Sequence, residues 1–197
     1  MIRRIKKLLM YFFYRRKFNG LHRSSFIADY RMLSPRYIRV GKGCIIWYNC
    51  RVEGVRTYNQ MVYEPLIVLE DGVKIQQNCH ITCAKSIVIG QNTCISANVT
   101  ITDINHQYQN INEAVEKQNL EVKSVAIGAD CKVYNGAVIL PGVTIGKHCV
   151  IGANSVVVRN IPDYCVAVGA PAKIIKRYDF ESKTWKKTDY NGNFIGD

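Results

Sequence analysis

The sequence lacks the features of a secreted, disulfide-bonded or membrane-spanning protein. Its apolar run from Leu8 to Tyr14 is too short to cross a bilayer. Arg15, Arg16 and Lys17 follow this run, where a signal peptide would need a small-residue cleavage site. Eight cysteines are present, but none of them form a CxxC pair and no secretion signal accompanies them. We therefore expect a cytoplasmic protein.

The start of the chain also lacks acidic residues, and the first acidic residue is Asp29. Eight of the positive charges behind the formal net charge of +12 lie before it, interleaved with aliphatic and aromatic residues. Such a segment is typical of an amphipathic helix on an anionic membrane surface, and equally of a solvated helix docked on the protein body. Both interpretations stay open here. The basic residues are Arg3, Arg4, Lys6, Lys7, Arg15, Arg16, Lys17 and Arg23.

What the sequence does contain is a repeat of six residues. A Leu, Ile or Val leads each of fifteen hexads, which fall into five groups of three. A helix needs a period near 3.6 and an ordinary strand a period of 2, so a period of six indicates a solenoid. The lead residues are Val40, Ile46, Val52, Leu69, Ile75, Ile81, Ile89, Ile95, Ile101, Ile127, Val133, Ile139, Ile145, Ile151 and Val157.

The repeat predicts an all-β parallel β-helix of about five coils. Each hexad is expected to form a short strand and a turn, and three hexads to close one coil around an aliphatic interior. Five cysteines occupy the fifth hexad position, where small residues also occur, so we interpret them as packing residues. These are Cys44, Cys50, Cys79, Cys131 and Cys149.

Three interruptions of the repeat predict loops. They are a short insertion at residues 58–68, two extra residues before Ile89, and a long loop at 102–126. We expect a basic N-terminal segment (1–24), a β-helix domain (25–176) and a C-terminal tail (177–197). The tail carries Tyr178, Phe180 and Trp185, which are suited to covering the apolar end of the solenoid.

His106 is the candidate catalytic residue, because it lies at the entrance of the long loop in the run from Asn98 to His106. A reaction in which a hydroxyl acts as nucleophile requires a base that removes the hydroxyl proton near neutral pH. A histidine, with an ordinary pKa of about 6.5, is best matched to that task. Its imidazolium can then protonate the group that departs.

These residues, with the runs Pro-Gly-Val-Thr-Ile-Gly at 141–146 and Val-Gly-Ala-Pro-Ala-Lys at 168–173, resemble the hexapeptide-repeat O-acetyltransferases. This family includes maltose and galactoside acetyltransferases and related polysaccharide-modifying enzymes. The resemblance runs from Leu69 to Lys176. It implies a left-handed β-helix, a homotrimer, acetyl-CoA as acyl donor without a metal, and direct transfer to a sugar hydroxyl in surface polysaccharide synthesis.

The resemblance also assigns roles to residues by their place in the family pattern. Gln76, Asn78 and Lys132 fall at acceptor-contacting positions, although Gln76 replaces an asparagine and Lys132 stands where some relatives carry a tryptophan. The positions that contact CoA are Asn135, Ala153, Arg159 and Lys173, the last of them beside a phosphate.

Asp103, three residues before His106, has two candidate roles. It either holds the imidazole of His106 in its reactive tautomer or bonds its own backbone in a turn. Alternative functions for the chain are N-acetylation of an amino sugar nucleotide and a non-catalytic binding solenoid. A zinc enzyme is disfavoured because the four histidines lack the close pair that a three-histidine zinc site on this scaffold uses. No nucleic-acid-binding motif is present, so we expect no nucleic-acid partner.

Overall fold

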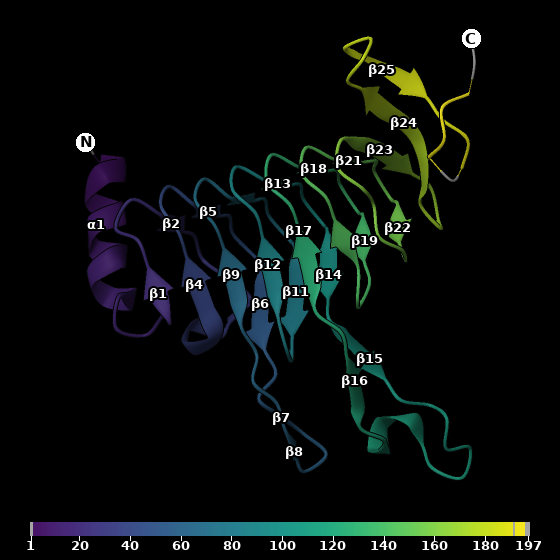
Figure 1. Ribbon diagram of the computed structural model, residues 1–197. Coiled ribbons are helices and arrows are strands. Elements are labelled where there is room, and N and C mark those ends of the chain that lie inside the picture. The colour runs from purple at the N-terminus through teal and green to yellow at the C-terminus, as the bar shows by residue number, and fades with distance from the viewer. Residues whose placement is uncertain (1, 191, 196–197) are drawn as a thin grey trace.

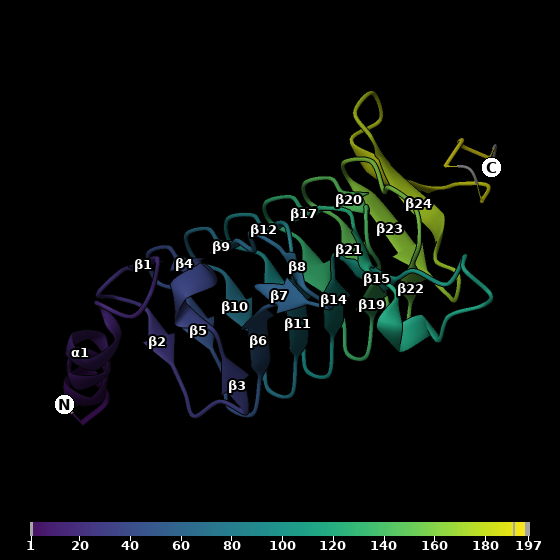
Figure 2. The same ribbon diagram turned by 90° about the horizontal axis from the view of Figure 1, so that it is seen from below.

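Short parallel strands wind around one axis and form a triangular column with three flat sheets (Figure 1). The computed structural model describes residues 2–190 and 192–195. The helix at the N-terminus and the antiparallel strands at the C-terminus lie at opposite ends of the column, and an arm projects from its side (Figures 1 and 2). The repeat therefore predicted the architecture correctly.

Each coil contributes one strand to each of the three sheets. The first sheet contains β1 (Gly20–Leu21), β4 (Ile38–Val40), β9 (Ile67–Leu69), β12 (Ile87–Ile89), β17 (Val125–Ile127) and β20 (Thr144–Ile145). The second contains β2 (Phe26–Ile27), β5 (Ile45–Ile46), β10 (Lys74–Ile75), β13 (Cys94–Ile95), β18 (Lys132–Val133), β21 (Val150–Ile151), β23 (Cys165–Val168), β24 (Lys173–Asp179) and β25 (Thr184–Lys187). The third contains β3 (Met32–Leu33), β6 (Arg51–Gly54), β11 (His80–Cys83), β14 (Thr100–Thr102), β19 (Val138–Ile139) and β22 (Val156–Val157).

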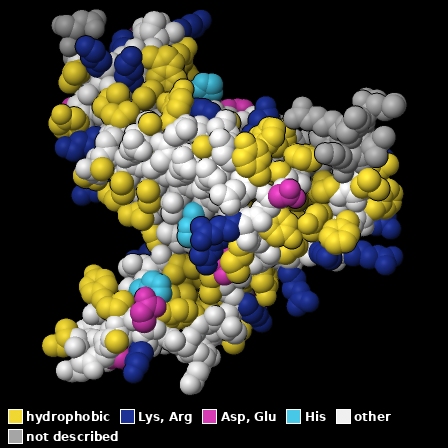
Figure 3. Space-filling model, turned by 180° about the vertical axis from the view of Figure 1, so that it is seen from behind, with side chains coloured by type: hydrophobic (Ala, Val, Ile, Leu, Met, Phe, Trp, Pro, Cys, Tyr) yellow, Lys and Arg dark blue, Asp and Glu magenta, His cyan; other side chains and the backbone are white. Residues whose placement is uncertain are grey.

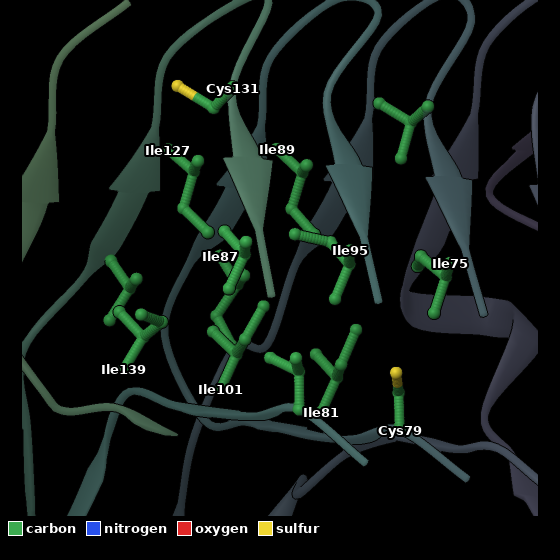
Figure 4. Packing of buried hydrophobic residues seen from close by; sticks show 14 of the residues in the cluster. Ile75, Cys79, Ile81, Ile87, Ile89, Ile95, Ile101, Ile127, Cys131 and Ile139 are labelled. Carbon is green, nitrogen blue, oxygen red and sulfur yellow. The ribbon is translucent and has the colours of Figure 1, made fainter. Parts of the chain in front are cut away.

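The lead aliphatic residues stack in register and fill the interior. Ile75 pairs with Ile95 in the second sheet and Ile81 with Ile101 in the third, and all four are fully buried (Figure 4). The five cysteines at fifth positions are buried too, as expected for packing residues. Because most of the apolar surface of each coil faces the next, removal of that surface from water is the main stabilising contribution.

In the five groups of hexads, the turn between the first and second sheets and the turn between the second and third each use a left-handed residue at the fourth hexad position. Asparagine, aspartate and glycine adopt this conformation at lower cost than other residues, which explains their recurrence there. In the second–third corner these residues are Asn49, Asn78, Asn98, Gly136 and Asn154.

The column has six complete coils, one more than the five groups of hexads. The additional coil contains β1, β2 and β3, and it pairs in parallel with β4, β5 and β6. Its lead residues are Leu21, Ile27 and Leu33, which keep the six-residue spacing. A short 3₁₀ helix, η1 (Pro35–Tyr37), then delays Val40 by one residue and hides the continuity of the repeat.

All three interruptions of the repeat occur at the same corner, between the third and first sheets. The insertion at residues 58–68 contains most of a small antiparallel hairpin formed by β7 (Thr57–Tyr58) and β8 (Met61–Val62). The two extra residues before Ile89 widen the corner at 84–86. The long loop forms an arm, in which β15 (Ile104–His106) pairs with β16 (Leu120–Val122) and a 3₁₀ helix, η2 (Val115–Lys117), lies between them.

Both ends of the column are covered. Helix α1 (Ile2–Tyr14) contacts the first coil through Met10 and Tyr14, and Phe18 joins the core behind it. Of the helices that the structure describes, none combines the length and apolar character that a membrane span requires. At the other end, β24 crosses the expected domain boundary at 176 and packs antiparallel on β23.

Candidate active site

His106 is the last residue of β15, on the arm that leaves the column between the fourth and fifth coils. Its backbone is paired with Leu120 of β16, and Gln107 donates its N–H to the carbonyl of Asn119 at 3.1 Å. The imidazole is half-buried. In the space-filling view a hollow separates the arm from the column, and a histidine on the arm lies beside an acidic side chain (Figure 3). The base predicted from sequence is therefore held on paired strands rather than on a free loop.

Tyr58, from the β7–β8 hairpin, contacts His106 although 48 residues separate them in sequence. The Tyr58 hydroxyl lies 3.3 Å from Nδ1 of His106, and the two rings meet edge to face with centroids 5.3 Å apart. The hairpin therefore reaches across two coils to the arm.

Glu116 fixes the direction of this hydrogen bond. The Tyr58 hydroxyl donates to Glu116, whose carbonyl oxygen is 2.8 Å away and whose Oε2 is 3.0 Å away. Burial and the adjacent Glu116 raise the pKa of the Tyr58 hydroxyl, so it stays protonated. Since its single proton points to Glu116, its oxygen accepts the Nδ1 proton of His106. The Nε2 atom then carries a free lone pair, and no described residue bonds to it.

Further contacts join the hairpin to the arm. The Asn59 side chain donates to the carbonyl oxygens of Glu116 at 2.8 Å and Gln118 at 3.0 Å, and the Leu120 N–H donates to the Tyr63 hydroxyl at 3.2 Å. A polar cavity of about 530 Å³ opens beside these contacts. Amide side chains dominate its lining, which includes Asn59, Gln60, Gln107, Asn110, Gln118 and Asn119.

The Asp103 carboxylate faces the widened corner of the preceding coil. It accepts the backbone N–H groups of Ala84 at 2.7 Å, Lys85 at 2.8 Å and Ser86 at 2.8 Å, and the Cys83 thiol at 3.3 Å. Asp103 is fully buried, and burial together with this carboxylate raises the pKa of Cys83. Neither role considered from the sequence describes these contacts. Asp103 anchors the base of the arm, and Tyr58 makes the contact with His106.

The residues expected at the acceptor lie at a different corner from His106. Asn78 occupies the second–third corner, where it accepts a hydrogen bond from Asn49 at 2.8 Å, and Gln76 lies directly after β10 in the same corner. Lys132 lies on the second sheet, with its Nζ 3.2 Å from the Cys94 sulfur and 5.3 Å from the centroid of the Tyr134 ring.

The residues expected to contact CoA fall into two groups. Asn135 and Ala153 are in successive turns of the second–third corner, where the Asn154 N–H donates to the carbonyl of Asn135 at 2.9 Å. Arg159 and Lys173 instead line a cavity of about 450 Å³ beyond the last coil. Tyr190 lines this cavity as well, 4.1 Å from the Lys173 ammonium.

Comparison with known proteins identifies the family of this chain. Residues 124–159 match the family model described as bacterial transferase hexapeptide (six repeats). The chain is 38% identical over 160 residues to WbbJ of Escherichia coli (strain K12), a protein named for O-acetyl transfer in lipopolysaccharide biosynthesis. The match covers 78% of this chain and 81% of WbbJ. The chain belongs to the hexapeptide-repeat acetyltransferase family.

Other relatives of this acetyltransferase agree with that assignment. It is 33% identical to the galactoside O-acetyltransferase of E. coli (strain K12) over 105 residues, which are 53% of this chain and 51% of the relative. The acetyltransferase VCA0836 of Vibrio cholerae, solved with acetyl-CoA, shares the fold with a TM-score of 0.60 and 20% identity over 89% of this chain and 83% of its own. AntD of Bacillus cereus, an N-acyltransferase solved with 3-hydroxybutyryl-CoA, superimposes with a TM-score of 0.70 and 15% identity, covering 88% and 90%. The β-helix is accordingly left-handed.

Sequence reasoning about this acetyltransferase missed Tyr58 and Glu116. Tyr58 lies in the insertion at 58–68, which was recognised as an interruption but given no role, and Glu116 lies inside the long loop. The available signal was that both interruptions follow the third hexad of a group. Insertions at equivalent positions of a solenoid emerge at the same corner, so their side chains can meet.

Proposed function

We propose that this acetyltransferase moves an acetyl group from acetyl-CoA to a sugar hydroxyl, with His106 as general base, in the synthesis of a surface polysaccharide. The observation that carries the proposal is the state of the His106 ring. Its Nδ1 is held by Tyr58 and its Nε2 is free to accept a proton. The names of two relatives, in lipopolysaccharide and galactoside O-acetylation, support a sugar hydroxyl as the acceptor.

The transfer proceeds in one ternary complex. Nε2 of His106 takes the proton of the acceptor hydroxyl while that oxygen bonds to the thioester carbonyl carbon. The tetrahedral intermediate collapses by breaking its carbon–sulfur bond, and the imidazolium gives the proton to the CoA thiolate. The proton lost by the acceptor thus ends on CoA, and the enzyme returns to its starting state.

The acetyl-CoA site is proposed on the later coils. The backbone N–H groups of the turns at Asn135 and Ala153 suit the pantetheine amides, and the cations Arg159 and Lys173 suit the phosphates. Stacking of Lys173 on Tyr190 supports a defined position for this ammonium group.

The family resemblance implies a homotrimer, and the division of these residues between two corners supports a site shared by neighbouring copies. His106 lies on the arm that extends from the third–first corner, whereas Asn78, Asn135 and Ala153 belong to the second–third corner. The strands of the third sheet run between the two corners, so one chain does not bring these groups together. A neighbouring copy that presents its second–third corner to the His106 arm would complete the site.

An acceptor panel tests the proposed reaction. Purified protein is incubated with acetyl-CoA and matched pairs of sugars that carry either a hydroxyl or an amine at the same carbon. We expect CoA release together with the mass gain of one acetyl group on hydroxyl acceptors. Acetylation confined to the amino sugars would replace the proposal with N-acetyl transfer. If CoA were not released and neither kind of acceptor gained mass, the proposal would be rejected.

Replacing Tyr58 by phenylalanine is expected to lower kcat about 10-fold to 100-fold with little change in KM, because the Nδ1 proton of His106 loses its acceptor. The two imidazole tautomers then mix, which ¹⁵N chemical shifts of His106 report directly. The matched control is Tyr108→Phe, an exposed tyrosine of the same arm. Unchanged ¹⁵N shifts in Tyr58→Phe would contradict the positioning role even if activity fell.

A further inference from the structure

Helix α1 has two apolar faces, and only one of them is used by the fold. Met10 and Tyr14 point toward the end of the column and pack against its core. The ring of Tyr14 meets Phe18 edge to face at 6.0 Å, and its hydroxyl donates to that of Tyr30 at 3.4 Å. These contacts account for the docking of the helix and leave its other face free.

Four large apolar side chains occupy the free face. Leu8, Leu9, Phe12 and Phe13 are exposed by 54%, 65%, 54% and 64%, respectively. Their spacing puts them on one side of the helix, away from Met10 and Tyr14. Beside them, a cavity of about 480 Å³ between α1 and β2 adds Phe26 to the apolar surface, and Asp29 also lines this cavity. A contiguous patch of this kind marks an interaction site, whereas scattered exposed apolar residues do not.

Cations border this apolar stripe. The Arg15 guanidinium lies 5.0 Å from the centroid of the Phe12 ring, and the Lys17 ammonium lies 4.1 Å from that of Phe13. The sequence before Asp29 contains eight Lys and Arg residues and no Asp or Glu. Large apolar side chains with a cationic border suit the boundary between acyl chains and anionic head groups.

We propose that the free face of α1 binds the surface of an anionic lipid bilayer. A second copy of the chain is a poorer occupant, because docking two of these faces would bring two uncompensated basic segments together. With α1 on the bilayer, the column stands on its N-terminal end. The His106 arm, which leaves after the fourth coil, is then held roughly 20 Å above the helix, since each coil rises about 4.8 Å.

Co-sedimentation of the full-length protein with vesicles tests this proposal without using catalytic activity. Phosphatidylcholine vesicles with phosphatidylglycerol are compared with phosphatidylcholine vesicles alone. We expect binding to the anionic vesicles only, and weaker binding as salt rises from about 0.1 M to about 1 M, because the Debye length falls from about 10 Å to about 3 Å.

Two pairs of variants separate the apolar and charged contributions. Phe12→Asp/Phe13→Asp is expected to weaken partitioning about 100-fold, since burial of each ring contributes at least about tenfold. Its control is Ile111→Asp, which changes a residue of the arm that is 92% exposed. Arg15→Glu/Arg16→Glu is expected to abolish the preference for anionic vesicles, and Lys74→Glu, on the exposed surface of β10, to retain it. Circular dichroism and the melting temperature verify folding.

Three results would overturn the proposal. These are equal binding to neutral and anionic vesicles, wild-type sedimentation of Phe12→Asp/Phe13→Asp, and no binding to anionic vesicles. In the last case, self-association that the double variant abolishes, measured by light scattering, would assign the face to a second copy. Since vesicle binding requires no acetyl transfer, each outcome is independent of the proposed reaction.

Discussion

His106→Ala is expected to fold normally and to lose acetyl transfer, with kcat lower by about 10²-fold to 10⁴-fold, the usual contribution of a positioned base. The side chain is half-buried on a short paired strand, and its removal leaves the backbone pairing with Leu120 intact. The affinity for acetyl-CoA should be unchanged, because the proposed donor site lies on other coils. Initial rates of CoA release and calorimetric titration with acetyl-CoA measure the two quantities.

A second histidine provides the control for this experiment. His22 is largely exposed in the first coil, and its imidazole Nδ1 lies 2.8 Å from the Ser24 hydroxyl and accepts the Ser24 N–H at 3.1 Å. His22→Ala should therefore retain wild-type kcat and KM. Wild-type turnover in His106→Ala would refute the mechanism, while loss of turnover in both variants with lowered melting temperatures would point to damaged folding.

The fold was predictable because its information is local and repeated. A Leu, Ile or Val at every sixth position specifies both the strand and its inward face, and repetition over fifteen hexads makes chance agreement negligible. The first coil escaped detection because the 3₁₀ helix η1, which begins at Pro35, shifts the lead residue by one position. A rule based on uninterrupted spacing cannot distinguish such a corner from the end of the repeat.

The site was predictable only in part. His106 was identified by its chemistry and its place at the start of the long loop. Its partner Tyr58 was not, because their contact depends on how two insertions, separated by two coils, lean toward each other. Neither insertion carries a repeat that would fix its conformation. Side-chain contacts between irregular segments depend on tertiary packing, which a single sequence does not display.

Asp103 shows a further limit of sequence reasoning. Its main partners are backbone N–H groups, which every residue except proline offers, so the identities of Ala84, Lys85 and Ser86 gave no indication of the contact. The two extra residues before Ile89 were the one available sign. They widen the corner whose N–H groups surround the carboxylate, and this contact forms only when the two coils are stacked.

Asp103→Ala is expected to lower the free energy of unfolding by about 3–6 kcal/mol. It leaves the buried N–H of Ala84 and the part-buried N–H groups of Lys85 and Ser86 without an acceptor. A buried group of this kind costs about 1–3 kcal/mol, and partial access to water keeps the other two in the lower part of that range. That loss is comparable with the whole stability of many domains, about 5–15 kcal/mol. Asp103→Asn keeps one oxygen acceptor but turns an NH₂ group toward the donors, so we expect about half the effect. Urea unfolding measures both variants.

The matched control is Asp71→Asn, because the Asp71 carboxylate accepts a single backbone N–H, that of Lys42 at 2.7 Å, at an exposed turn. Its expected cost is below about 1 kcal/mol. Since Asp103 anchors the arm that carries His106, folded Asp103→Asn protein should also lose activity, with increased hydrogen exchange across β15 and β16. If Asp103→Asn kept wild-type stability and exchange but lost kcat, the carboxylate would be acting on the imidazole directly, and its role as an anchor would be refuted.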